Sequence, residues 1–322
     1  MDKYIGHPMQ LYGVKSVRID GGKGDGMRLL QVNNGSGLNF TVSADRCADI
    51  SELSFKGTNY AYIAPAGYVS TKYFDNKGAG FLKSFTAGFM TTCGFDNVGS
   101  PNTDEGEELN LHGTISHTPC ENISYTIEDN AIVIKAVIRD AALFNHQLLL
   151  EREYVCPLFE NFIYMKDTIT NIGPKECPLE VLYHCNMGYP LLSENSILDI
   201  PADKVVPRNE HAASGMKDCL KIEKPQPDYE DMCFFHEMSG EVCVSLYNPQ
   251  IDKSLKLSYN SNELGFFTQW KMMGEHEYVM GLEPGNCNPD GRKAMRELGK
   301  LEFLKPGENK VHNLKFEFTE EK

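Results

Sequence analysis

Three short segments, far apart in the chain, carry side chains that could transfer protons. They are residues 110–113 (NLHG), 183–186 (YHCN) and 281–286 (GLEPGN). They contribute His112, His184 and Glu283. Imidazole and carboxyl groups are the commonest general acids and bases in proteins. If the fold brings the three together, the site could both remove a proton from a ligand and donate one to it.

Two of these residues lie in segments with the pattern of strands. In residues 179–190 (LEVLYHCNMGYP), alternation with a period of two places His184 and Asn186 on the more polar face. In residues 276–286 (HEYVMGLEPGN), the same alternation places Glu283 opposite a stripe of apolar residues. Pro284 restricts Glu283 to extended backbone, which fixes the direction of its carboxylate at the end of the strand.

The segment 109–117 (LNLHGTISH) also has the alternation of a strand and is predicted to form a third one. Asn110 and His112 would share one face, whereas His117 would lie on the other. The two histidines lack the i, i+4 helical spacing of a metalloprotease motif, and no carboxylate directly follows His112. We therefore expect both to contact a ligand and neither to bind a metal.

Further polar groups could hold a hydroxyl-bearing ligand. Asn97 lies in a glycine-flanked turn, where it either presents its amide to a ligand or simply forms the turn. Arg46 and Asp49 are close in sequence and could form a salt bridge or clamp two neighbouring hydroxyls. The last candidates are Gln269 and the single tryptophan, Trp270, which is either a stacking platform or part of the core.

The elements that must position these groups are mostly strands. Short runs rich in Val, Ile, Tyr, Phe and Thr recur between Gly, Asn, Asp and Pro clusters, which predicts antiparallel sheets. Helices are expected only near residues 292–298 and 74–83. Residues 21–26 (GGKGDG) lie between two strand-like runs and open no helix, so we interpret them as a hairpin turn rather than a phosphate-binding loop. Residues 221–231, with two prolines, are predicted to form a surface excursion.

No linker or repeat divides the chain, so residues 1–322 are interpreted as a single domain. The 31 Lys and Arg against 45 Asp and Glu give a net charge of −14, which disfavours nucleic acid and anionic membranes as partners. No stretch approaches the roughly 18 apolar residues of a membrane helix, and the first ten residues have no apolar signal region, so we expect a cytoplasmic protein.

The ten cysteines are scattered and form no CxxC pair. We expect them to be reduced rather than joined in disulfides. Cys185 and Cys243 lie in apolar strand patterns and are interpreted as small buried residues.

Four segments together resemble a known group of proteins. They are residues 91–99 (TTCGFDNVG), 111–119 (LHGTISHTP), 182–192 (LYHCNMGYPLL) and 278–286 (YVMGLEPGN), the last followed by Gly291 and Arg292. In this order they resemble the aldose 1-epimerase (galactose mutarotase) superfamily, in particular its less characterised aldose 1-epimerase-like branch. The resemblance extends over residues 45–308.

That resemblance implies a β-supersandwich, in which large antiparallel sheets pack face to face around an open cleft that binds a monosaccharide or a sugar derivative. It implies that Glu283 acts as base and His184 as acid in interconverting the α and β anomers, with neither metal nor cofactor. His112 and Arg46 would bind the sugar. Arg292 could bind an anionic group on it, and a homodimer is compatible with these features.

Two other functions remain open at this stage. The same cleft could belong to a non-catalytic protein that binds or senses carbohydrate. A glycoside hydrolase or lyase on a related sandwich is the other possibility, but hydrolysis normally requires two carboxyl groups on either side of one bond. The sequence offers Glu283 and no clear partner for it.

Overall fold

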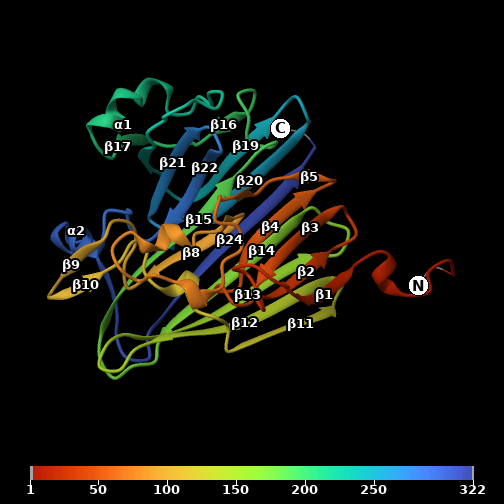
Figure 1. The fold of residues 1–322 in the computed structure, drawn as a ribbon, viewed down its shortest axis with the longest axis horizontal. Helices are drawn as coiled ribbons and strands as arrows, with labels where there is room; N and C mark the ends of the chain where they lie inside the picture. Colours follow the sequence, from red (N-terminus) through yellow and green to blue (C-terminus); the bar gives the residue numbers. More distant parts are fainter. Residues whose placement is uncertain (1–2, 321–322) are drawn as a thin grey trace.

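The computed structural model describes residues 3–320, and strands dominate it as the sequence predicts. An antiparallel sheet of five strands begins the chain (Figure 1). Its strands, in order across the sheet, are β1 (Gly13–Arg18), β2 (Arg28–Asn33), β3 (Leu38–Ser43), β4 (Asp49–Phe55) and β5 (Thr58–Asn59). The glycine-rich residues 21–26 lie in the turn between β1 and β2, which pair antiparallel, so the hairpin interpretation is confirmed.

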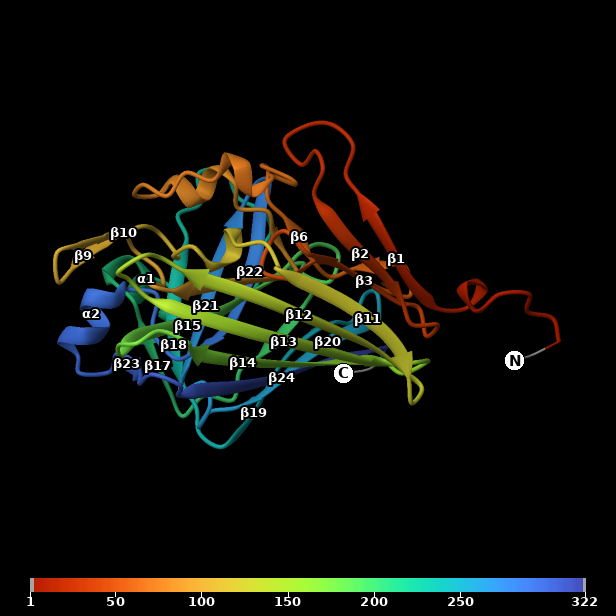
Figure 2. The same ribbon diagram turned by 90° about the horizontal axis from the view of Figure 1, so that it is seen from below.

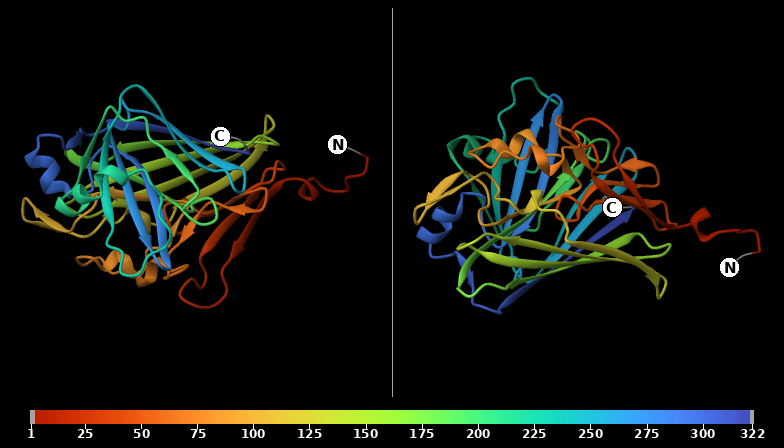
Figure 3. Two further views of the ribbon diagram at one scale, coloured as in Figure 1. Left: turned by 90° about the horizontal axis from the view of Figure 1, so that it is seen from above. Right: turned by 60° about the horizontal axis from the view of Figure 1, so that its bottom comes forward.

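The second sheet has eight strands and forms the base of the molecule. In order they are β11 (Asn122–Glu128), β12 (Ala131–Ala141), β13 (Gln147–Pro157), β14 (Phe162–Asn171), β24 (Asn309–Thr319), β20 (Lys253–Asn260), β19 (Glu241–Asn248) and β16 (Ile197–Asp199). In Figure 3 its long strands form one layer, and the red N-terminal strands and the blue strands of the third sheet lie over the same side of it. Figure 2 gives the labels for this arrangement.

The third sheet carries the candidate site. In order its strands are β17 (Lys204–Pro207), β18 (Met232–Glu237), β21 (Phe266–Gly274), β22 (Glu277–Gly285), β15 (Cys177–Met187) and β23 (Glu302–Leu304), and β8 (Met90–Phe95) also pairs with β15. Two short ribbons complete the strands: β6 (Tyr62–Ile63) with β7 (Ala87–Gly88), and β9 (Asn102–Asp104) with β10 (Glu107–Leu109). Antiparallel pairing therefore dominates all the large sheets, as expected.

Helices are short and peripheral. The α-helices are α1 (Glu210–Ser214) and α2 (Arg292–Glu297), and α2 confirms the helix predicted near residues 292–298. The helix predicted over residues 74–83 is wrong in extent, because only the 3₁₀ turns Thr71–Tyr73 and Gly80–Lys83 form there. The other 3₁₀ turns are Pro8–Gln10, Ile115–His117 and Met216–Asp218. Among residues 3–320, no helix is long and apolar enough to cross a membrane.

Side-chain alternation explains how the sheets pack. In β12, Ile132, Ile134 and Ile138 are buried, whereas Lys135 and Arg139 point outward. One continuous hydrophobic core combines such inward residues of the eight-stranded sheet with those of both other sheets. Burial of this apolar surface is the main force that holds the layers together. The β-supersandwich predicted from the resemblance is therefore the observed architecture.

Most of the described cysteines are buried, as expected, and all ten are free thiols. The interpretation of Cys243 as a buried residue is wrong, because its side chain lies on the exposed face of β19. The neighbouring residues Val242 and Val244 occupy the buried face instead.

Candidate active site

A cleft of about 520 Å³ opens on the face of the third sheet that points away from the main core. Three neighbouring strands supply its floor: β15, β22 and β21. The alternation read from the sequence holds in β22, where Glu277, Val279 and Glu283 line the cleft and the intervening residues join the core. It holds in β15 as well, since His184 lines the cleft.

The centre of the cleft is a pair of groups that can exchange protons. His184 Nε2 lies 3.2 Å from Glu283 Oε1, and the two side chains are 7% and 2% exposed. The two atoms are close but are not aligned as a hydrogen bond. Both groups are therefore available to a ligand that enters the cleft.

A missing side chain makes room for the Glu283 carboxylate. Gly281 precedes Glu283 on the same face of β22, and it is the register partner of Trp270 in β21. A Cβ atom at Gly281 would lie 2.2 Å from Glu283 Oε1 and 2.9 Å from Trp270 Cβ. Only glycine at this position allows the carboxylate to lie where it meets His184.

Burial sets the protonation of the pair. Desolvation raises the pKa of Glu283 well above its usual value, an effect that the nearby Arg208 guanidinium opposes. Desolvation lowers the pKa of His184 to about 4. Both shifts favour the uncharged form of each group, and a ligand that changes the surroundings can move a proton from one group to the other.

Comparison of the sequence with known families shows to which family the chain belongs. A sequence profile for a family described as a domain of unknown function (DUF4432) matches residues 24–318, most of the chain. The chain belongs to the DUF4432 family. No curated protein sequence matches it.

Solved structures similar to this DUF4432 protein share its fold. A candidate aldose 1-epimerase from Klebsiella pneumoniae superposes with a TM-score of 0.90 at 22% identity, over 97% of this chain and 86% of the other. A galactose mutarotase-like protein from Clostridium acetobutylicum has a TM-score of 0.69 at 14% identity, over 96% and 99% of the chains. The galactose 1-epimerase of Lactobacillus acidophilus has a TM-score of 0.65 at 14% identity, over 97% and 100%. The fold is galactose mutarotase-like.

His112 reaches the cleft from a loop, so the strand predicted over residues 109–117 is wrong. Beyond β10, His112 has the left-handed φ of +57° and Gly113 has +68°, and a 3₁₀ turn begins at Ile115. The Gly99 N–H donates to His112 Nδ1 over 3.2 Å. Burial, and then the neighbouring His184, lower the pKa of His112. In the neutral ring whose Nδ1 accepts, the proton lies on Nε2, which can donate to a ligand.

Asn97 positions this loop rather than lining the cleft. Its Nδ2 donates to the Asn110 carbonyl over 2.7 Å, and its Oδ1 accepts from Asn102 Nδ2. The Arg292 N–H donates to the same oxygen. The turn-forming interpretation of Asn97 therefore fits its contacts, and its effect on the cleft passes through the loop that carries His112.

Trp270 lines the cleft as the stacking interpretation requires, and its ring centroid lies 5.3 Å from that of His184. Its indole N–H donates to Asp231 Oδ2 over 2.8 Å. Asp231 also lines the cleft, although it ends the segment 221–231 that the sequence predicts to be a surface excursion. Arg208 is a further lining residue that sequence reasoning missed, because no motif surrounds it.

Arg46 and Asp49 do not reach the cleft, and they form neither the salt bridge nor the hydroxyl clamp that the sequence left open. Arg46 donates to the backbone carbonyls of Ser116, Val69 and Ser84 and so ties three loops together. Asp49 lies in the main core, where its Oδ1 is 2.7 Å from Arg152 Nη1. Both are structural here, because the side chains they were expected to offer to a ligand are buried with protein partners.

The remaining candidates also lie outside the cleft lining. His117 contacts the hydroxyls of Ser116 and Ser84 through its two ring nitrogens. Asn186 is fully buried and donates to the His184 carbonyl. Gln269 points to the other face of β21, where it pairs with His236. Arg292 belongs to a different cavity and pairs with Asp104 and Glu107.

Proposed function

We propose that this DUF4432 protein is an aldose 1-epimerase-like enzyme that interconverts the anomers of a sugar. The observation that carries the proposal is the His184–Glu283 pair, with 3.2 Å between Nε2 and Oε1. The anomeric hydroxyl oxygen and the ring oxygen of a sugar are bonded to one carbon. Two proton-transfer groups this close together can reach both oxygens at once.

In the proposed reaction, Glu283 removes the proton from the anomeric hydroxyl while His184 donates a proton to the ring oxygen. The bond between the anomeric carbon and the ring oxygen breaks, and a free aldehyde and a new hydroxyl form. After rotation about the adjacent carbon–carbon bond, the reverse transfers close the ring on the other face of the aldehyde. Every proton removed is returned, so the reaction needs no further reactant.

Other lining residues support this role. The Nε2–H of His112 can donate to a sugar hydroxyl, and Trp270 offers an aromatic face to the C–H side of a ring. Burial favours the uncharged form of each group, and these two forms together carry one titratable proton. This is the proton count that the reaction needs, because ring opening moves the proton from His184 as Glu283 gains another from the sugar.

The direct test is NMR exchange spectroscopy between α and β anomers for a panel of neutral, acidic and phosphorylated aldoses. Glu283→Gln keeps the shape of the side chain but removes the base, and it should lower the exchange rate by about 10²- to 10⁴-fold. Glu128→Gln, in the exposed edge strand β11, is the matched control and should retain the parent rate. Equal rates for parent and Glu283→Gln on the best sugar would refute the assignment of the base.

Binding separates this proposal from a sensing protein. Trp270 is the chain's single tryptophan and lines the cleft, so its fluorescence should change when a sugar binds. Saturable binding to the parent with no acceleration for any sugar would favour carbohydrate sensing.

A hydrolase remains a second candidate because two further carboxylates, Asp231 and Glu277, line the same cleft. Either could partner Glu283 across a glycosidic bond. Release of a reducing sugar from a methyl or aryl glycoside, dependent on Glu283 and on one of these two residues, would favour hydrolysis over epimerisation.

A further inference from the structure

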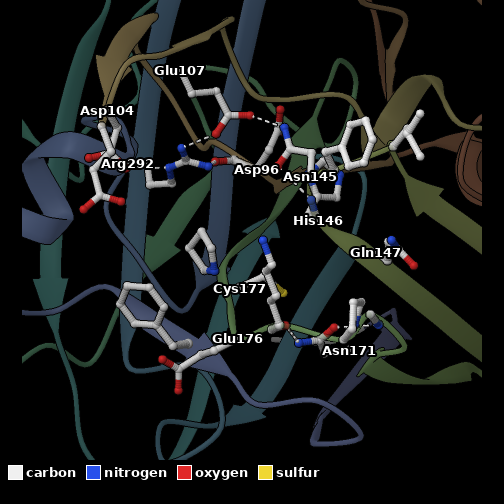
Figure 4. A pocket seen from close by; sticks show the side chains of 18 of the residues that line it. Asp96, Asp104, Glu107, Asn145, His146, Gln147, Asn171, Glu176, Cys177 and Arg292 are labelled. Atoms are coloured by element: carbon white, nitrogen blue, oxygen red, sulfur yellow. Dashed lines mark hydrogen bonds and ion pairs between the residues drawn. The ribbon is translucent and has the colours of Figure 1, made fainter.

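A second cavity, of about 450 Å³, shares no lining residue with the proposed active site, and Figure 4 shows its lining. The turn between β12 and β13, the loop between β14 and β15, and helix α2 line it. Asp96 and His146 lie on one side of the cavity, whereas Asn171, Glu176 and Cys177 lie on the other (Figure 4). The segment from Asp96 to Ser100 borders both this cavity and the active-site cleft.

The cavity contains buried polar atoms that have no partner. Asp96 is only 8% exposed, and its Oδ1 makes no hydrogen bond. His146 Nδ1 also makes no hydrogen bond, whereas His146 Nε2 lies 3.4 Å from its ion-pair partner Asp140 Oδ1. A buried polar group without a partner is costly, and such groups are rare in folded proteins. A ligand with hydroxyl groups would supply the missing donors and acceptors.

The charged side chains of the lining disfavour an anionic ligand. The acidic residues outnumber the cationic ones: Asp96, Asp104, Glu105, Glu107 and Glu176 against Lys175, Arg292 and Arg296. Arg292 is neutralised by Asp104 and Glu107, and Arg296 by Asp104. An added anion would meet the remaining carboxylates, whereas hydroxyl groups of a neutral ligand can donate hydrogen bonds to them. Burial, and then the nearby Asp140, raise the pKa of Asp96 to about 6, so above that pH its carboxylate is a strong hydrogen-bond acceptor.

The rim of the cavity carries an aromatic side chain that the fold does not bury. Phe144 is 93% exposed in the turn between β12 and β13, and its φ of +65° is unusual for a bulky residue. Leu143 beside it is 82% exposed. Phe303, which also lines the cavity, is 39% exposed, and the Arg296 guanidinium lies 5.4 Å from its ring centroid. Aromatic faces beside hydrogen-bonding groups suit the C–H face of a polyhydroxyl compound.

We propose that this cavity is a second binding site, which takes a neutral polyhydroxyl compound such as a monosaccharide or an alditol. Hydroxyl groups of the ligand donate to Asp96 and pair with His146, and Phe144 covers its apolar face. The site uses none of the residues assigned to epimerisation. It therefore stands or falls independently of the proposed function.

Alditols are the probe that separates the two sites. They lack a ring oxygen and an anomeric carbon, so epimerisation cannot consume them. We would titrate the parent protein with a panel of pentitols and hexitols by isothermal calorimetry and by NMR. The same titrations on Glu283→Gln report whether the active-site cleft contributes to the signal.

Two variants test the lining directly. Asp96→Asn removes the charged acceptor at constant shape and should weaken binding by about 10- to 100-fold. Phe144→Ala removes the exposed ring and should weaken binding at least several-fold without unfolding the chain. Phe159→Ala is the matched control, because Phe159 is also an exposed aromatic in a turn, with a φ of +64°, and it lies outside the cavity. It should bind like the parent.

Saturable binding that Asp96→Asn and Phe144→Ala weaken, and that Glu283→Gln and Phe159→Ala leave intact, is the expected result. No saturable binding of any alditol to the folded parent would overturn the proposal. Binding that Glu283→Gln abolishes but the Phe144→Ala variant retains would also overturn it, because the active-site cleft would then be the binding site. The Phe144 variant keeps the test decisive if Asp96→Asn fails to fold.

Discussion

Replacing Gly281 by alanine should displace the Glu283 carboxylate and so slow the proposed reaction. The new Cβ would lie 2.2 Å from Glu283 Oε1, and contacts under 3.0 Å are essentially never found for real Cβ atoms. The carboxylate must therefore move by 0.8 Å or more. The backbone of Gly281 cannot easily retreat, because it pairs with Trp270 on one side and Asn186 on the other.

The size of the effect follows from how sharply proton transfer depends on position. Misplacing a catalytic group by about 1 Å costs about 10²-fold in rate. We expect Gly281→Ala to lower kcat/KM for anomer exchange by about that factor. Overpacking against Trp270 should also lower the free energy of unfolding by about 1–3 kcal/mol, which leaves a protein of ordinary stability folded.

The assay combines NMR anomer exchange with urea unfolding on the same preparations. Gly265→Ala is the matched control, since Gly265 lies just before β21 and a Cβ there would have its nearest contact at 3.7 Å. That variant should keep the parent rate and change the free energy of unfolding by about 1 kcal/mol or less. If Gly281→Ala is folded and exchanges anomers within twofold of the parent, the position of the Glu283 carboxylate is not what limits the reaction.

Three further predictions follow from burial. Desolvation lowers the pKa of His184 to about 4, so the His184–Glu283 pair should gain a second proton only below about that pH. In a plot of kcat/KM against pH, activity should therefore fall on the acid side only near pH 4. A fall centred near pH 6.5 would contradict this prediction. Arg152→Met leaves two buried carboxylates without their cation and should cost about 3–5 kcal/mol of unfolding free energy in urea titrations, and a loss below 1 kcal/mol would show that the network is dispensable. Cys243 should be the fast-reacting thiol of the native protein towards a disulfide reagent, and Cys243→Ser should remove that phase; survival of the phase would point to another exposed cysteine.

The pair of residues at the centre of the site could be predicted because its setting is local. Alternation along a strand places every second side chain on one face, and this alone put His184 and Glu283 on the faces that line the cleft. The strand runs, the hairpin turn after β1 and helix α2 were likewise readable, since each depends on neighbouring residues.

Contacts between distant segments could not be predicted from the sequence in the same way. The expected strand around His112 is a loop in left-handed conformation, held by a hydrogen bond from Gly99 that no local pattern encodes. Arg46 and Asp49 are neighbours in sequence, but the core offers Asp49 a better partner in Arg152, about a hundred residues away. Asp231 lies at the end of the segment 221–231, and it is held at the cleft by a hydrogen bond from the Trp270 indole N–H.

The sequence by itself determined the strand-rich architecture and the faces on which the acid and the base lie. Only the tertiary structure decided that these two groups meet within 3.2 Å, that Gly281 leaves room for the carboxylate, and that Arg46, Asp49, His117, Asn186 and Gln269 lie elsewhere. The physical reason is that alternation is set by the backbone of one strand. Proximity, burial and the resulting pKa shifts are set by which strands pair and which faces pack together.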